Sequence, residues 1–71
     1  MEVEAMSAAM ELYENKDEAK FLAYCQEKNL EVKVINEKDG VKTFRIAGVV
    51  DAVFYNKPGK AKSVSIIVVP N

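Results

Sequence analysis

The chain has 71 residues, of which 49% are hydrophobic and 30% are charged, and its formal net charge is −1. This composition is typical of one folded domain, which at this length buries only about 60% of its unfolded surface and therefore needs an efficient core or self-association. Histidine is absent and Cys25 is the single cysteine, which argues against an intrachain disulfide and a structural zinc site. There is no apolar run near the roughly 18 residues of a membrane span and no signal-peptide pattern, so we expect a cytoplasmic protein.

Residues 4–14 and 17–28 are both predicted to be helical. Met6, Ala9, Met10 and Tyr13 recur at helical spacing in the first segment, and Phe21, Tyr24 and Cys25 do so in the second. The first segment is also rich in Glu, Ala, Met and Leu, which are strong helix formers. These spacings predict that each segment buries one apolar face.

The boundaries of the second helix are marked by polar residues. Asn15 followed by Glu18 is typical of a capping signal, Asp17 is an alternative N-cap, and Asn29 suits the position just past the helix end. The polar residues 14–17 either separate two helices or form the exposed middle of one long helix. The sequence leaves both alternatives open.

The remainder of the chain is predicted to form strands. Residues 30–36 alternate in polarity, and Asp39-Gly40 is a strong hairpin signal. Residues 41–55 are rich in β-branched and aromatic side chains, and we expect one long strand with a bulge or bend at Gly48. A Pro58-Gly59 turn then leads to a last strand over residues 62–69. The expected fold is therefore α+β: a single domain over residues 1–71, with one long or two short N-terminal helices packed on a three-stranded antiparallel β-meander.

Both faces of the last predicted hairpin are substantially apolar. Counting outward from its turn places Val49, Asp51, Val53 and Tyr55 on one face, beside Lys62, Val64, Ile66 and Val68. One helical layer covers one face only, so either the N-terminal segment folds over the second face or another copy of the chain covers it. We expect a homodimer whose interface includes Val49, Asp51, Val53, Val64 and Ile66. Asp51, as a lone carboxylate in an apolar run, either lies at a rim, pairs with a lysine or makes a polar contact within that interface.

The sequence lacks the residue patterns of common active sites. There is no histidine for general acid–base catalysis or for a triad with Ser7, Ser63 or Ser65. No glycine-rich phosphate loop is present, and Cys25 on an apolar helix face is predicted to be a buried structural thiol. We therefore expect a non-enzymatic protein that needs no cofactor and no metal.

Charge is unevenly distributed along the chain. Residues 1–40 hold ten acidic and five basic residues, whereas residues 41–71 hold one acidic and five basic residues, giving net charges of −5 and +4. The acidic part is either a solvated helix face or a surface that docks on a basic protein. The candidate partner-binding residues are Glu4, Glu11, Glu14, Asp17, Glu18, Glu37 and Asp39.

The basic part suggests an alternative function. Lys57, Lys60 and Lys62 cluster at the last hairpin with Tyr55 adjacent, and lysines beside an aromatic ring on a β-surface can bind single-stranded nucleic acid. The other interpretation is a solvated hairpin whose lysines protect a sheet edge. A third possibility is a structural subunit of a larger assembly, for which neither charged surface matters.

The positions of the acidic residues also give this chain a general resemblance to one class of small proteins. With Glu2, Glu4, Glu11, Glu14, Asp17 and Glu18 in its opening segment, and Glu37 and Asp39 at a turn, this short chain resembles the small proteins that phages make to take over a host. Some of those proteins bind nucleoid or polymerase proteins, and some imitate DNA. The resemblance implies an inhibitor of a host DNA-binding protein, acting in the host cytoplasm.

Overall fold

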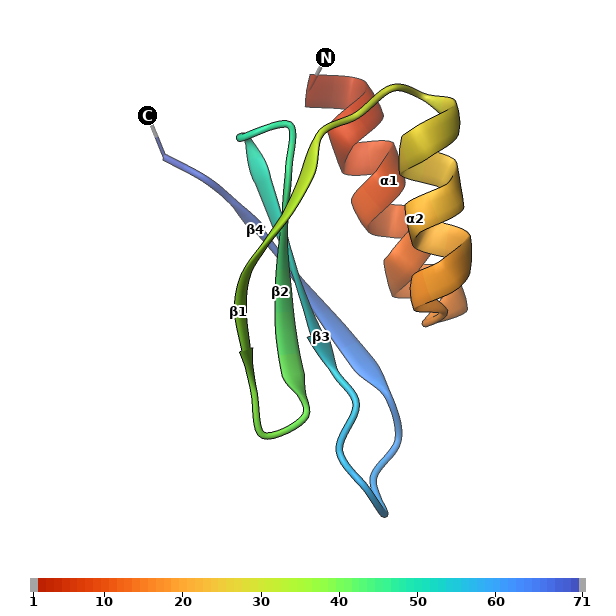
Figure 1. Cartoon of the computed structure of the whole chain (residues 1–71), viewed down its shortest axis with the longest axis vertical. Coiled ribbons are helices and arrows are strands. Elements are labelled where there is room, and N and C mark those ends of the chain that lie inside the picture. The colour runs from red at the N-terminus through yellow and green to blue at the C-terminus, as the bar shows by residue number, and fades with distance from the viewer. Residues whose placement is uncertain (1, 71) are drawn as a thin grey trace.

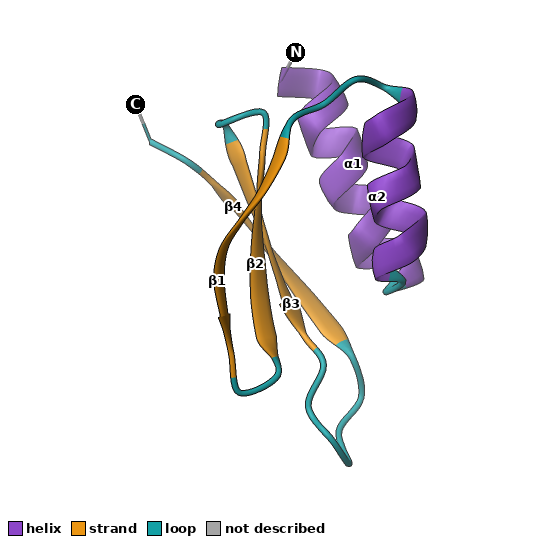
Figure 2. Ribbon diagram, in the orientation of Figure 1, coloured by secondary structure: helices purple, strands orange, loops and turns teal. Residues whose placement is uncertain are grey.

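Two antiparallel helices pack on one face of a four-stranded antiparallel sheet (Figure 1). The computed structural model describes residues 2–70. The helices are α1 (Glu2–Asn15) and α2 (Glu18–Glu27). The strands are β1 (Val32–Lys38), β2 (Val41–Ile46), β3 (Val50–Tyr55) and β4 (Ser63–Val68), and they lie in chain order across the sheet (Figure 2). The predicted α+β class is confirmed.

The N-terminal region forms two helices and not one. Lys16 has a positive φ of 52°, which ends α1, and its N–H donates to the carbonyl of Leu12 at 2.8 Å. Asp17 is the N-cap of α2, because its side chain accepts from the N–H of Lys20 at 3.2 Å. Between the helices, Lys16 thus ends α1 with a left-handed backbone conformation, and Asp17 then caps α2.

The end of α2 is a Schellman motif around Asn29. Asn29 has a φ of 57° and donates to Gln26, and the N–H of Leu30 donates to the carbonyl of Cys25 at 2.9 Å. The prediction that Asn29 follows the helix end is confirmed.

The prediction of three strands is wrong, because residues 41–55 form a hairpin. Ala47 and Gly48 both have positive φ, 52° and 72°, and the N–H of Val49 donates to the carbonyl of Ile46 at 3.0 Å. Two consecutive positive φ values define a type I′ turn, which reverses the chain in two residues. The predicted bend at Gly48 is therefore a full reversal, and the sheet gains a fourth strand.

The predicted register of the last hairpin is wrong by one residue. Phe54 pairs with Val64 and Asp51 pairs with Ile67. Because side chains alternate between faces, Val64 and Ile66 lie on the helix-covered face, whereas Asp51 and Val53 lie on the other face. The expected dimer interface is thus divided between two faces, and its remaining member, Val49, is partly buried against the core.

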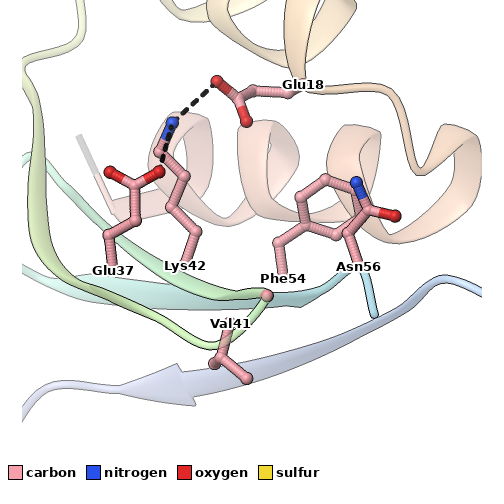
Figure 3. Close-up of a pocket in the computed structure, with 7 residues that line it drawn as sticks. Glu18, Glu37, Val41, Lys42, Phe54 and Asn56 are labelled. Atoms are coloured by element: carbon pink, nitrogen blue, oxygen red, sulfur yellow. Dashed lines mark hydrogen bonds and ion pairs between the residues drawn. The ribbon is translucent and has the colours of Figure 1, made fainter. Parts of the chain in front are cut away.

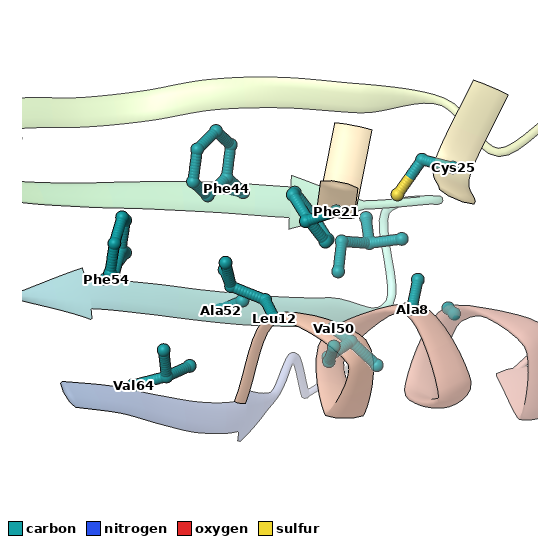
Figure 4. Packing of buried hydrophobic residues seen from close by; sticks show 12 residues of the cluster. Ala8, Leu12, Phe21, Cys25, Phe44, Val50, Ala52, Phe54 and Val64 are labelled. Carbon is teal, nitrogen blue, oxygen red and sulfur yellow. The ribbon is translucent and has the colours of Figure 1, made fainter. Parts of the chain in front are cut away.

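The core lies between the helices and the sheet (Figure 4). The rings of Phe21 on α2 and Phe44 on β2 have centroids 5.0 Å apart and tilt by 54°. The sheet adds Ile46, Val50, Ala52, Phe54 and Val64, and α1 adds Ala5, Ala8, Ala9 and Leu12. No helix within residues 2–70 combines the length and the apolar character needed to cross a membrane.

The buried face of α1 differs from the predicted one. Of Met6, Ala9, Met10 and Tyr13, only Ala9 is buried. Alanines on the buried face let the helix backbone approach the sheet closely, so the larger side chains are left on the outside. They are 37% exposed at Met6, 39% at Met10 and 47% at Tyr13.

Candidate interaction surface

The outer side of α1 carries a row of carboxylates, Glu4, Glu11 and Glu14, which we term the acidic ridge. Glu4 and Glu14 are exposed, and Glu11 is half-buried with its Oε1 accepting from Asn15 Nδ2 at 3.0 Å. Their spacing of seven and three residues keeps them on one side of the helix. Within residues 2–70, the ion pairs of the structure involve none of the three. The ridge is therefore a set of charges without intramolecular compensation.

An apolar row runs beside the acidic ridge on the same helix. This row, which we term the α1 stripe, consists of Val3, Met6, Met10 and Tyr13. All four side chains are exposed. Val3, Met6 and Met10 line a shallow groove together with Ser7 and Glu14. Methionine is frequent at protein-binding surfaces because its flexible, polarisable side chain adapts to a partner. α1 thus presents an acidic and an apolar surface in addition to its buried face.

The other predicted acidic residues have structural roles. Glu18 and Glu37 lie on either side of Lys42, with their Oε2 atoms 3.0 and 3.7 Å from Lys42 Nζ (Figure 3). Asp17 caps α2, and Asp39 occupies the β1–β2 turn with a φ of 54°. The seven predicted partner-binding carboxylates are therefore not brought together as one surface.

Lys42 is a residue that the sequence interpretation missed. Its ammonium lies 5.4 Å from the centroid of the Phe44 ring, and the hydrogen bond that it donates to Glu18 raises the pKa of Lys42 above its usual value. These contacts tie α2 to the β1–β2 hairpin at the rim of a cavity of ≈ 140 Å³. The signal was present in the sequence, because the Asp39-Gly40 turn places Lys42 opposite Glu37.

Asp51 is paired with Arg45 across the sheet. Arg45 Nε and Nη2 donate to the two carboxylate oxygens at 2.8 and 2.9 Å, and the residues are direct partners in the β2–β3 register. This forked geometry compensates a carboxylate that is only 9% exposed. Of the alternatives that the sequence left open for Asp51, pairing with a cation is the one observed, and the cation is Arg45 and not a lysine.

The predicted basic site is partly assembled. Tyr55, Lys57 and Lys60 line a surface depression with Ala61 and Ser63 at the β3–β4 loop, whereas Lys62 is exposed outside it. The Pro58-Gly59 turn is present, with a φ of 74° at Gly59 and the N–H of Lys60 donating to Lys57. The depression therefore brings together one aromatic residue and two lysines.

Cys25 is buried against the core, as predicted. It is 2% exposed, and burial raises the pKa of its thiol to about 11, which keeps it protonated at neutral pH. Among the residues that the structure describes, no cluster of three or more His, Cys, Asp or Glu side chains is placed to hold a metal ion. Comparison with protein-family models, curated proteins and solved structures found no match to this chain.

Proposed function

We propose that this protein is a non-enzymatic binding protein that engages a basic surface of another protein through the acidic ridge of α1. The observation that carries the proposal is the position of Glu4, Glu11 and Glu14 on one side of a helix, without a cationic partner within residues 2–70. Carboxylates grouped in this way create a local negative potential that speeds encounter with a basic partner and selects against acidic ones.

The ion pairs of the fold narrow the proposed contact surface. Lys42 pairs with both Glu18 and Glu37, so its one positive charge offsets half of their negative charge and weakens their field at a distance. Asp17 is engaged as an N-cap. The partner-binding residues that we propose are therefore Glu4, Glu11 and Glu14, whereas Asp39 lies apart from them in the β1–β2 turn.

Basic protein surfaces commonly serve to bind nucleic acid. A row of carboxylates on α1 would occupy such a surface and compete with its nucleic acid, which is the mode of action expected for an inhibitor of a DNA-binding protein. The resemblance in type to small phage proteins supports this same role. Binding is expected to weaken as salt rises, because the contacts are exposed and charged.

A triple Gln variant at Glu4, Glu11 and Glu14 tests the proposal. It removes three charges while retaining size and helix propensity. The matched control replaces three exposed carboxylates elsewhere, as Glu27→Gln, Glu31→Gln and Asp39→Asn. Each tagged protein is incubated with nuclease-treated bacterial lysate and eluted with a salt gradient. We expect the wild type and the control to retain the same basic protein and the triple variant to lose it. Retention by the triple variant at the same salt would refute the role of the ridge.

Nucleic-acid binding at the β3–β4 loop is the second candidate function. It is favoured by the depression that Tyr55, Lys57 and Lys60 line. The experiment is anisotropy of a labelled single-stranded oligonucleotide, with Lys57→Glu and Lys60→Glu as the variant. Salt-sensitive binding that this variant abolishes would support the second candidate, and binding unaffected by it would count against the site. If neither charged surface changes any interaction, the remaining candidate is a structural subunit.

A further inference from the structure

The two edge strands of the sheet differ in how they are protected against pairing with another strand. β1 carries Lys33, Glu37 and Lys38, and its register with β2 shifts between Val34 and Asn36. Charges and irregularities of this kind prevent an edge from pairing. β4 has the sequence SVSIIV, without a charge or a proline, and it pairs with β3 in an unbroken register. β4 is therefore a regular and unprotected edge.

The free side of β4 presents a defined set of backbone groups. The N–H of Val69 donates to the carbonyl of Val49, so alternation directs the N–H groups of Val64, Ile66 and Val68 away from β3. These groups are available to another strand. An antiparallel partner strand would satisfy them and extend the sheet.

The α1 stripe lies on the same side of the molecule as the β4 edge. α1 packs on β3 and β4, whereas α2 lies in front of it in Figure 1 and contacts β2 through the Phe21–Phe44 pair. α1 runs downward in that view, and the right-handed course of the helix turns Met6, Met10 and Tyr13 away from α2, toward the β4 side. The acidic ridge is turned away from the sheet.

A second copy of the chain fits both features at once. Antiparallel pairing of β4 with its copy about a two-fold axis perpendicular to the sheet keeps both helical layers on one face. Because α1 packs on both β3 and β4, the two α1 axes would be separated by about two strand spacings, roughly 10 Å. This is the separation of packed helices, about 8–10 Å, so the two stripes would meet. A strand from an unrelated protein would satisfy the edge and leave the stripe uncovered.

The apolar area available is sufficient for a specific interface. Val3, Met6, Met10 and Tyr13 of the stripe are 37–78% exposed, and Ile67 and Val68 of β4 are 52% and 63% exposed. Together these side chains expose on the order of 500 Å² per copy, and roughly 1,000 Å² for two copies reaches the lower limit of a specific interface before the backbone is counted. A 71-residue chain without a disulfide also gains stability from such burial.

We propose that two copies of this chain pair through β4 and the α1 stripe to form a continuous eight-stranded sheet. This interface replaces the one expected from the sequence, which combined residues of opposite faces. Glu4 and Glu11 of both acidic ridges remain uncovered on the helical side of the dimer, and Glu14 lies at the rim of the contact.

The test is the molar mass in solution, measured by sedimentation equilibrium as a function of concentration. We expect a dimer for the wild type, and a loss of affinity on the order of 100-fold for Met10→Lys and for Ile67→Lys, which place charges in the interface. Leu22→Lys on α2 and Ile35→Lys on β1 are matched controls, because these residues are 38% and 45% exposed on other surfaces. The controls are expected to dimerise as the wild type does.

Hydrogen exchange of the wild type gives an independent measurement that requires no variant. The amides of Val64, Ile66 and Val68 are expected to become more protected as the protein concentration rises, whereas the β1 edge is not. A monomer at every concentration would overturn the proposal. It would be overturned equally by a dimer that Met10→Lys and Ile67→Lys leave intact, or by unchanged exchange at these three amides.

Discussion

Replacing each turn glycine by alanine gives a quantitative test of the two tight hairpins. Gly40 and Gly48 both have positive φ, 81° and 72°, and both end a two-residue turn. They differ in their surroundings. A Cβ at Gly48 would meet nothing within 4 Å, whereas a Cβ at Gly40 would lie 3.0 Å from the backbone oxygen of Asn56 and 3.1 Å from Lys57 Cγ. The pair therefore separates conformational strain from steric overlap.

The expected magnitudes follow from these differences. An L-residue in the left-handed region costs about 1–2 kcal/mol, and the lower unfolded-state entropy of alanine returns about 0.4–1 kcal/mol. Gly48→Ala should thus lower the free energy of unfolding by about 1 kcal/mol. In Gly40→Ala, the new Cβ also crowds the backbone oxygen of Asn56 and disturbs the 2.8 Å hydrogen bond from the Asn56 N–H to the Gly40 carbonyl. This variant should therefore lower the free energy of unfolding by about 2–3 kcal/mol.

The free energies of unfolding of both variants are measured by urea unfolding followed by circular dichroism. All proteins are compared at the same low concentration, so that any self-association contributes equally. On heating, each kcal/mol corresponds to a fall of about 4–8 °C in Tm for a domain of this size. An unchanged or raised stability for Gly48→Ala would refute the turn, because glycine in an extended strand is the weaker residue. Equal costs for the two variants would refute the contact between the β1–β2 turn and Asn56.

Two further predictions concern the core. Leu12 is fully buried on α1 and Leu22 is 38% exposed on α2, so Leu12→Ala should cost about 2–5 kcal/mol of unfolding free energy and Leu22→Ala less than about 1 kcal/mol; similar costs in urea unfolding would contradict the assigned helix faces. The raised pKa of Cys25, from 9.0 to about 11, means that the unfolded thiol ionises before the folded one as pH rises. The associated stability is present below pH 9 and is lost between pH 9 and 11, by about 2–3 kcal/mol. Cys25→Ala should lack this step when unfolding is compared across that range.

Local signals with a specific physical cause were read correctly from the sequence. Asn29 ends α2, and Asp39-Gly40 and Pro58-Gly59 form turns. At the start of α2, the structure uses the alternative cap Asp17 and places Asn15 in the last turn of α1. In each case a side chain or a missing Cβ favours one backbone conformation over its alternatives. The turn at Ala47-Gly48 was missed because alanine gives no sign of a left-handed conformation, and a single glycine in a β-rich run is equally consistent with a bulge.

Helical periodicity alone was insufficient to orient α1. Ala5, Ala8, Ala9 and Leu12 repeat at the same spacing as the predicted set Met6, Ala9, Met10 and Tyr13, so both sets satisfy the pattern of a buried face. Side-chain size favours the second set, whereas close packing against the sheet and α2 favours the first. Which set is buried depends on the tertiary distance between layers, which a local pattern does not contain.

The acidic character of the N-terminal region was predictable, whereas the number of carboxylates that the fold leaves unpaired was not. Counting acidic residues identified the N-terminal region, but the count includes carboxylates that the fold uses internally. Glu18 illustrates this, because its partner Lys42 is 24 residues away in the sequence and belongs to the basic half. The opposite charges of the two halves are thus partly an intramolecular pairing across the layers of the domain.

The proposed dimer and the proposed partner surface are compatible, because they meet only at Glu14, which lines the groove of the α1 stripe. Pairing through β4 and the α1 stripe buries methionines beside the acidic ridge, leaves Glu4 and Glu11 uncovered and places Glu14 at the rim of the contact. Two ridges then lie on neighbouring helices, six carboxylates in place of three, and the potential that attracts a basic partner rises accordingly. The wild type should therefore elute from such a partner at higher salt than Met10→Lys or Ile67→Lys. This difference in salt concentration should exceed the one between the wild type and the controls Leu22→Lys and Ile35→Lys, which add the same positive charge outside the proposed interface. Equal elution of all four variants would show that the ridge acts as a single copy, even if the chain dimerises.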